Sequence, residues 1–249
     1  MSIEKIFRYS SNDTHTTLTR TQKVQNIIVA IDGFAACGKS TTAKRVAQRL
    51  GYLYIDTGAM YRAVTLAFLR QGISFEEETP EMLEALNKLS VRFSLDDPES
   101  PQILLNEEAV EDQIRTPEVS DAVSLVSKHP SVRHAMVREQ RKMGENKGIV
   151  MDGRDIGTYV FPHAELKIFL VADMEIRAYR RQLQYEKKGI RMTLNDIIKN
   201  LEERDFIDTN REIAPLKKAK DAITIDTSYI SFQEQVQQVY HLAMTCLVV

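Results

Sequence analysis

The 249-residue sequence contains little cysteine, no tryptophan and almost no net charge. Its two cysteines, Cys37 and Cys246, lie far apart, so they suggest no disulfide framework and point to a reducing compartment. A formal net charge of −2 excludes binding to polyanions through overall charge, so we expect no nucleic-acid partner and only local basic sites. No apolar run approaches the roughly 20 residues that a membrane helix needs. We therefore expect a cytoplasmic protein with no membrane partner.

The N-terminus also lacks the apolar segment of a signal peptide. Residues 1–25 are polar and rich in Ser and Thr, and we interpret them as a disordered leader. The sequence as a whole is 43% hydrophobic and 27% charged, which is typical of a globular protein. Its length is sufficient for one large domain or two small ones, and we assign that role to residues 26–249.

Short apolar runs alternate with helical segments on both sides of a central block. One helix is predicted to end at Gly51 and another to begin at Thr57. Asp173 is predicted to be a helix N-cap, and the stretches beginning at Thr193 and Ser231 have capping-box spacing. This alternation predicts an α/β protein with a parallel sheet. The five predicted strands are residues 27–31, 52–55, 148–151, 166–171 and 222–226.

The central block, residues 73–146, interrupts this alternation. Thr79-Pro80 and Thr116-Pro117 mark helix starts, because Thr caps a helix and Pro fits its first position. We interpret the block as an insertion that forms a second lobe on a core made of about residues 26–72 and 147–249. Its other predicted elements are two strands around a turn, and one helix: residues 91–95 and 102–105, 96–99, and 131–144.

One segment fits the motif G-x-x-x-x-G-K-[ST] in full and directly follows an apolar strand, as the motif requires. Its glycines let the loop wrap around phosphate oxygens with its N–H groups pointing inward. Lys39 is expected to reach the β- and γ-phosphates, and Ser40 to supply a hydroxyl ligand to Mg²⁺. The motif predicts a nucleoside triphosphate site without separating kinases from switches, motors or ATP sensors. The predicted ATP-binding residues of the loop are Gly33, Phe34, Ala35, Ala36, Cys37, Gly38, Lys39, Ser40 and Thr41.

The sequence DTGAMYR, residues 56–62, follows the second predicted strand. Its arginine, Arg62, lies one turn into the next helix and could hold the phosphate of an acceptor near the first site. A surface arginine beside an N-cap Asp or Thr explains the same spacing equally well.

The sequence MDGRDIG, residues 151–157, places two carboxylates and a guanidinium at the carboxyl end of a strand, where α/β sheets bind ligands. Asp152 ends an apolar run, as expected of a Walker-B-type acid near Mg²⁺. Asp155 could accept hydrogen bonds from an exocyclic amine, as carboxylates do with cytosine N4. The alternative is a tight turn with an internal Arg–Asp ion pair.

Arginines recur at helical spacing in the last third of the chain. One set lies at i, i+3 and i+4, and a second set of two arginines and an aspartate lies at i, i+4 and i+7. Such clusters could neutralise charge on a transferring phosphoryl group. A solvated helix with salt bridges to nearby acidic residues remains the alternative. The two sets are Arg177, Arg180 and Arg181, and Arg204, Asp208 and Arg211.

Taken together, these segments resemble the bacterial cytidylate kinase family. The resemblance runs from about Ile27 to the C-terminus. It implies a P-loop NTPase fold with a five-stranded parallel sheet, an inserted nucleotide-monophosphate lobe and a short helical lid at about residues 177–192. The segments that carry it, in order, are GKST, DTGAMYR, IRTPEVS, VMDGRDIGT, FPHAELKIFL, RAYRR, ERD and IAPLKKAKDAITIDT.

The resemblance also implies roles for individual side chains. The acceptor phosphate would be held by Arg62, Arg154 and Arg211. The cytosine edge would be read by Ser124, Arg133 and Asp155, and the ribose held by Arg204 and Asp208. Tyr61 would line the base pocket, and Thr57 stands where the family also has Ser. A mobile lid over ATP would contain Arg177, Arg180 and Arg181. The residues expected to take part in catalysis are Lys39, Arg154, Asp155, Arg181 and Arg211, with Ser40 and Asp152 at Mg²⁺.

The implied activity is phosphoryl transfer from Mg·ATP to CMP or dCMP by a monomeric enzyme. The alternatives are another small-acceptor kinase, acting on UMP, AMP or shikimate, and an ATP-binding switch without an acceptor. The loop departs from the family pattern at residues 34–37, where Phe-Ala-Ala-Cys replaces the frequent Pro, Ser and Gly. Cys37, near a helix N-terminus, is either a reactive thiol that ATP shields or a small inert filler.

Overall fold

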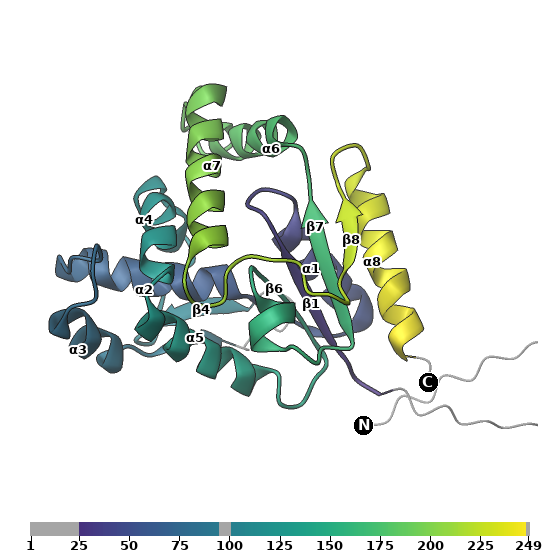
Figure 1. Ribbon diagram of the computed structural model, residues 1–249, viewed down its shortest axis with the longest axis horizontal. Coiled ribbons are helices and arrows are strands. Elements are labelled where there is room, and N and C mark those ends of the chain that lie inside the picture. The colour runs from purple at the N-terminus through teal and green to yellow at the C-terminus, as the bar shows by residue number, and fades with distance from the viewer. Residues whose placement is uncertain (1–24, 95–100, 248–249) are drawn as a thin grey trace, which may run out of the picture.

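The computed structural model describes residues 25–94 and 101–247. A parallel sheet of five strands lies at its centre, in the order β2-β6-β1-β7-β8 (Figure 1). This confirms the α/β class and the five-stranded parallel sheet predicted from the sequence. The strands are β1 (Ile28–Gly33), β2 (Leu53–Asp56), β6 (Ile149–Gly153), β7 (Leu166–Val171) and β8 (Ile223–Asp226).

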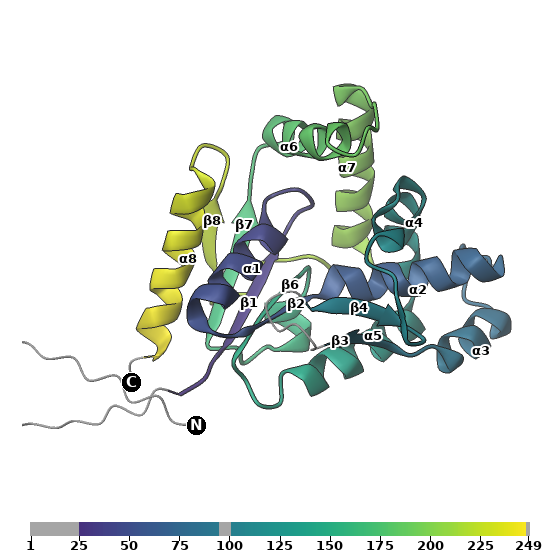
Figure 2. The ribbon, with the colours of Figure 1, turned by 180° about the vertical axis from the view of Figure 1, so that it is seen from behind.

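Both faces of the sheet are covered, which explains why its strands are apolar runs rather than alternating ones. On one face Val29 and Ile31 of β1 pack in a cluster with α1 (Lys39–Leu50) and α8 (Phe232–Leu247), the two helices that lie in front of the sheet in Figure 2. On the other face Ala30 belongs to a cluster with α5 (Pro130–Met143) and the π-helical turn η2 (Ile156–Val160).

The elements of the central block pack around α2 (Thr57–Gln71). Met60 and Phe68 of α2, both fully buried, share one apolar cluster with Met82 and Ile103 of the block. The predicted turn at 96–99 lies outside the described residues. The block contains α3 (Pro80–Lys88), the antiparallel sheet of β3 (Val91–Ser94), β4 (Gln102–Leu105) and β5 (Glu108–Ala109), the 3₁₀ turn η1 (Gln113–Arg115), α4 (Pro117–Ser127) and α5.

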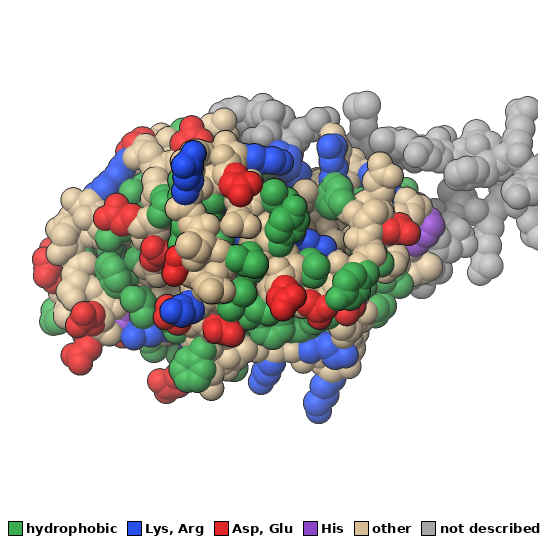
Figure 3. Space-filling view, turned by 90° about the horizontal axis from the view of Figure 1, so that it is seen from above, with side chains coloured by type: hydrophobic (Ala, Val, Ile, Leu, Met, Phe, Trp, Pro, Cys, Tyr) green, Lys and Arg blue, Asp and Glu red, His purple; other side chains and the backbone are tan. Residues whose placement is uncertain are grey.

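Two helices, α6 (Met174–Glu186) and α7 (Leu194–Asn210), stand beyond the carboxyl ends of the strands (Figure 1). Tyr185 and Leu201 in these helices form a small apolar cluster with Ala35, so the pair is packed onto the loop after β1. On the face seen from above, acidic and basic side chains are interspersed with apolar ones (Figure 3).

Most predicted helix boundaries follow the local capping chemistry. The Thr79, Thr116 and Thr193 side chains each accept a hydrogen bond from a backbone N–H in the first turn of their helices. Ser231 forms a full capping box, because its hydroxyl accepts from the Glu234 N–H while the Glu234 carboxylate accepts from the Ser231 N–H.

Asp173 is the N-cap residue of α6, as predicted, but it caps the helix without a side-chain hydrogen bond. Its side chain instead accepts a hydrogen bond from the Tyr229 hydroxyl at 2.8 Å. Of the predicted leader, residues 1–24 lie outside the described residues. None of the helices in the described part of the chain is long and apolar enough to cross a membrane.

Candidate active site

A cavity of about 580 Å³ lies at the carboxyl ends of β2 and β6, beside the loop of residues 33–40, hereafter the phosphate loop. Its walls also come from α2, α4, α5, α6 and α7, so the strand ends and the block residues meet in one space. The predicted residues that line it are Ala35, Ala36, Gly38, Lys39, Ser40, Thr41, Thr57, Tyr61, Arg62, Ser124, Arg133, Asp152, Arg154, Asp155, Arg181, Arg204, Asp208 and Arg211. Five predicted residues do not line it: Gly33, Phe34, Cys37, Arg177 and Arg180.

The first glycine of the phosphate loop is required by packing rather than by a ligand. Gly33 has φ 147°, and a Cβ atom there would lie 2.2 Å from the backbone oxygen of Leu170 in the neighbouring strand. Any other residue would push β1 away from β7 at the point where the loop begins. The sequence motif marks this glycine correctly, while its site role remains a prediction.

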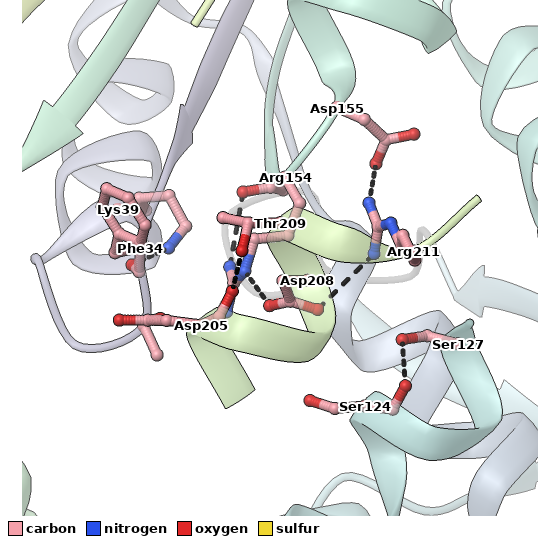
Figure 4. A network of polar contacts seen from close by, with 12 residues as sticks. Phe34, Lys39, Ser124, Ser127, Arg154, Asp155, Asp205, Asp208, Thr209 and Arg211 are labelled. Carbon is pink, nitrogen blue, oxygen red and sulfur yellow. Dashed lines mark hydrogen bonds and ion pairs between the residues drawn. The ribbon is translucent and has the colours of Figure 1, made fainter. Parts of the chain in front are cut away.

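The motif lysine lies at the wall of the cavity and is almost fully buried. The Lys39 ammonium donates to the Phe34 backbone oxygen at 2.5 Å, so its charge is held at the base of the phosphate loop (Figure 4). Burial, followed by repulsion from Arg154, lowers the pKa of Lys39. An anion in the cavity would relieve both effects, because it would offer the ammonium a negative partner.

Ser40 and Asp152 lie together at one side of the cavity. The Ser40 hydroxyl donates to Asp152 Oδ2 at 2.9 Å, and the Tyr54 hydroxyl donates to Oδ1 at 2.9 Å. Burial and the neighbouring Asp56 carboxylate raise the pKa of Asp152 to about 7. A cation at Asp152 would favour its ionised form.

These two oxygen ligands fit Mg²⁺, which typically takes one or two protein ligands and completes its shell with water and phosphate oxygens. In residues 25–94 and 101–247 no group of three or more His, Cys, Asp or Glu side chains could hold a metal ion. The nucleotide would therefore have to supply the remaining ligands of a magnesium ion at Ser40 and Asp152.

Arginines crowd the opposite wall of the cavity. Burial, then the nearby Arg204 and Arg115, hold the pKa of Arg62 well below its ordinary value. Burial, with Arg181 and Arg154, lowers the pKa of Arg204 to about 10. Guanidinium groups that depress one another in this way form a site that an anion stabilises, because a bound negative charge removes their mutual repulsion.

A buried ion-pair network joins the predicted base-reading and phosphate-holding residues. Arg133, with no exposed surface, donates to Asp155 and lies with its guanidinium carbon 5.3 Å from the centroid of the Tyr61 ring. Arg211 lies between two carboxylates, 3.3 Å from Asp155 and 3.5 Å from Asp208 (Figure 4). The alternative interpretation of MDGRDIG, a tight turn with an internal Arg–Asp ion pair, is not what the structure shows. Asp155 pairs with arginines of other segments, and Arg154 pairs with Asp208.

Asp208 links this network to the strand motif. It accepts a hydrogen bond from Arg154 Nε at 2.8 Å (Figure 4). Although burial alone would raise the pKa of Asp208, Arg154 and Arg211 hold it below its ordinary value. Asp208 therefore remains an anion that orients two of the predicted phosphate ligands.

The three arginines of α6 do not act as one face. Arg181 lines the cavity, while Arg177 donates to Asp205 at 2.6 Å and to the Ala35 backbone oxygen at 3.3 Å. Arg180 donates to the Thr227 hydroxyl at 3.0 Å. The three arginines share one face of α6, as predicted, but their long side chains extend from that face to three different places.

The sequence model of the family described as cytidylate kinase matches residues 29–245. The chain belongs to the cytidylate kinase family. It is 53% identical to a cytidylate kinase of Cytophaga hutchinsonii over 223 residues, which cover 89% of this chain and 94% of that protein. A cytidylate kinase of Bacteroides fragilis is 50% identical over 216 residues, covering 85% and 94% of the two chains. Among solved structures, a gluconokinase from Sinorhizobium meliloti superimposes with a TM-score of 0.46 at 14% identity, covering 90% of this chain and 95% of its own.

Several residues of the cytidylate kinase site were missed by sequence reasoning. Arg115 lines the cavity and forms an ion pair of 2.8 Å with Asp56, although the sequence marked it only as part of IRTPEVS. Its position directly before the N-cap Thr116 was the available signal. The other missed lining side chains are Asp56, Ser120, Val123, Ser127, Gln184, Tyr185, Lys187 and Lys188.

Cys37 is fully buried, and its thiol donates to the Phe34 backbone oxygen at 2.9 Å. A thiol without exposed surface cannot meet a reagent unless the phosphate loop opens. Of the two interpretations of Cys37, the structure therefore favours the inert filler.

Proposed function

We propose that this member of the cytidylate kinase family transfers the γ-phosphoryl group of Mg·ATP to CMP or dCMP. The observation that carries the proposal is the single cavity that joins the phosphate loop to an arginine-rich wall and to the Asp155–Arg133 pair. Relatives about half identical over most of the chain carry the name cytidylate kinase, which supports the same acceptor. An ATP-binding switch would have no use for the second anion site.

The acceptor phosphate oxygen is already an anion, so the reaction needs alignment more than a general base. That oxygen forms a bond to the γ-phosphorus while the bond from γ-phosphorus to the bridging oxygen breaks and leaves its electrons on ADP. Lys39, Arg181, Arg154 and Arg211 all line the cavity. We propose that Lys39 and Arg181 balance charge on the transferring group and that Arg154 and Arg211 hold the acceptor phosphate. Mg²⁺ held at Ser40 and Asp152 would neutralise charge on the ATP phosphates.

Base selection is proposed to depend on Asp155 and Arg133, together with Ser124, which lines the same cavity. A carboxylate accepts from cytosine N4, and a guanidinium donates to the acceptors at N3 and O2. Uracil presents an acceptor where cytosine has its amine, so it would face the Asp155 carboxylate with a repelling oxygen. Arg204 and Asp208 remain the proposed ribose contacts. The cytoplasmic location, the monomeric state and the domain boundaries remain predictions.

ADP release from Mg·ATP, with CMP, dCMP, UMP, AMP and shikimate offered separately, tests the proposal. Strong turnover with CMP and dCMP and little with the others is the expected result. Turnover with AMP or shikimate alone would show that the acceptor is not CMP or dCMP. If folded protein released no ADP in response to any acceptor, the ATP-binding switch would be favoured.

Replacement of Asp155 by Ala separates base reading from ATP binding. The variant should lose roughly a hundredfold in kcat/KM for CMP, because its buried arginine partners lose the carboxylate that orients them. ATP affinity, measured by calorimetry without an acceptor, should stay nearly unchanged. An equal loss for both nucleotides would count against the assignment of Asp155 to the base.

A further inference from the structure

Asp32 has a buried carboxylate to which the sequence motifs assign no role. It is the next-to-last residue of β1 and is 4% exposed. Its Oδ1 accepts from the Ile156 N–H and its Oδ2 from the Gly157 N–H, both at 2.8 Å. These two N–H groups open the turn η2, where the first N–H groups have no acceptor within the turn itself. Asp32 therefore satisfies two donors that burial would otherwise leave unpaired.

Asp32 lies next to two residues of the active-site cavity. In the sheet, Asp32 lies opposite Gly153, and its side chain bonds to the backbone of Ile156. The two residues in between, Arg154 and Asp155, both line the cavity. One residue of β1 thus holds the chain on both sides of them.

The same residue also borders the ATP side of the cavity. Gly33 follows Asp32 directly and begins the phosphate loop, at a position where only glycine fits beside β7. Asp32 is consequently a rigid link between the loop that is proposed to hold ATP and the segment that is proposed to hold the acceptor.

Burying a carboxylate at the position of Asp32 costs free energy. The described residues give Asp32 no ion-pair partner, and burial raises its pKa to about 6. Asn has nearly the same shape and would avoid the cost of burying a charge. Its amide, however, has one accepting oxygen and one donating nitrogen, so it cannot accept from both N–H groups. The requirement for two acceptors accounts for the carboxylate.

We infer that Asp32 is a positioning residue for the acceptor nucleotide, which it serves by fixing Arg154 and Asp155 relative to the phosphate loop. The inference rests on the proposed function, because it takes Arg154 and Asp155 to be acceptor ligands. A residue needed only for folding would affect both nucleotides alike. A positioning residue for the acceptor should affect CMP and spare ATP.

The first test is the Asp32→Asn variant of the full chain. It should lose roughly ten- to a hundredfold in kcat/KM for CMP, since small displacements of positioning groups cost rates of that size. The dissociation constant of ATP, measured by calorimetry without an acceptor, should change by less than about twofold. Asp226→Asn is the matched control, because Asp226 is an exposed strand-end aspartate whose carboxylate also accepts a backbone N–H. Unchanged CMP kinetics, or an equal loss for ATP, would overturn the inference.

Amide hydrogen exchange tests the anchor without any substrate. In the wild type the Ile156 and Gly157 amides should be protected, and in Asp32→Asn at least one should exchange more than about tenfold faster. Unprotected amides in the wild type would overturn the inference even if the variant failed to fold. Protected amides in a protein that phosphorylates no acceptor would instead show that the proposed function is wrong while the anchor is present.

Discussion

The guanidinium carbon of Arg177 lies 5.3 Å from the centroid of the Phe34 ring. The Phe34 ring also meets the Phe169 ring edge-on, with 6.0 Å between centroids. Because Arg177 also bonds to Asp205 and to the Ala35 backbone, the phosphate loop is tied to α6 and α7 through one arginine. Arg177 therefore has partners within the protein and does not line the cavity.

Phe34→Leu should test this tie. Leucine keeps an apolar side chain beside Leu216 and Ala222, but it removes the ring face under Arg177. We expect a loss of about 1 kcal/mol in the free energy of unfolding, measured with urea, and little change in KM for ATP. A large increase in that KM at unchanged stability would show that Arg177 acts on ATP instead.

A second prediction concerns the backbone of the same loop. Ala36 has φ 60°, a left-handed conformation that costs an alanine about 1 kcal/mol relative to glycine. Ala36→Gly should therefore leave the free energy of unfolding unchanged or raise it by up to about 1 kcal/mol, after the entropy of the unfolded chain is subtracted. Ala47→Gly, in the middle of α1, is the control and should lose at least about 1 kcal/mol. Similar losses in both variants would show that Ala36 is not strained.

The two thiols should differ in reactivity. Cys246 is partly exposed and Cys37 is not, so N-ethylmaleimide should label Cys246 alone in the native protein and leave kinase activity intact. Peptide mass spectrometry identifies the modified residue, and urea-unfolded protein provides the control in which both react. Labelling of Cys37 with loss of activity that ATP prevents would restore the reactive-thiol interpretation.

Stability should also respond to pH through Asp32. Its pKa is raised from 3.8 to about 6 by burial, so between these values the folded protein binds a proton that the unfolded chain releases. The contribution of this group to the free energy of unfolding is therefore full below about pH 3.8 and is lost as pH rises from there through about 6. The Asp32→Asn variant has no titratable carboxyl group at this position, so its stability does not fall with pH for this reason.

The free energy of unfolding of Asp32→Asn relative to wild type should consequently rise by about 2 kcal/mol between pH 4.5 and pH 7.5. The hydrogen bond that Asn cannot make changes the difference in free energy of unfolding by the same amount at every pH. The change of that difference with pH therefore reports the titration of Asp32. Asp155 and Lys39 are the charged groups that act on Asp32, and neither changes in the variant. A difference that does not vary with pH would mean that Asp32 titrates at its ordinary value.

The residues that the sequence could predict are those whose role is local. Thr79, Thr116 and Ser231 cap helices through bonds that span three residues, and the phosphate loop is a contiguous motif. Arg115 and Asp32 escaped notice because their partners, Asp56 and Ile156, are distant in the chain and meet them only after folding. The sheet order has the same origin, since pairing between strands depends on packing that no short window contains.

The last prediction concerns the crowded arginines of the cavity, which lower the stability of the ligand-free protein and raise its affinity for CMP. Arg204 has a pKa lowered to about 10, and its Nε finds no partner among the described residues, so its charge destabilises the ligand-free protein. Arg204→Met should unfold at an equal or higher temperature than wild type, while KM for CMP rises at least about tenfold. Arg115→Met is the contrasting control.

Arg115 differs because it is paired with Asp56 at 2.8 Å. Its removal takes the ion-pair partner from the buried Asp56 carboxylate and leaves it the hydrogen bond from the Ala59 N–H. Arg115→Met should therefore lose about 2 kcal/mol in the free energy of unfolding. Saturating CMP should raise the melting temperature of wild type more than that of Arg204→Met. A ligand stabilises the folded protein more when it binds more tightly, and the variant lacks one of the arginines that bind the anion. If Arg204→Met instead unfolds well below wild type, Arg204 stabilises the fold and the crowding is not a cost.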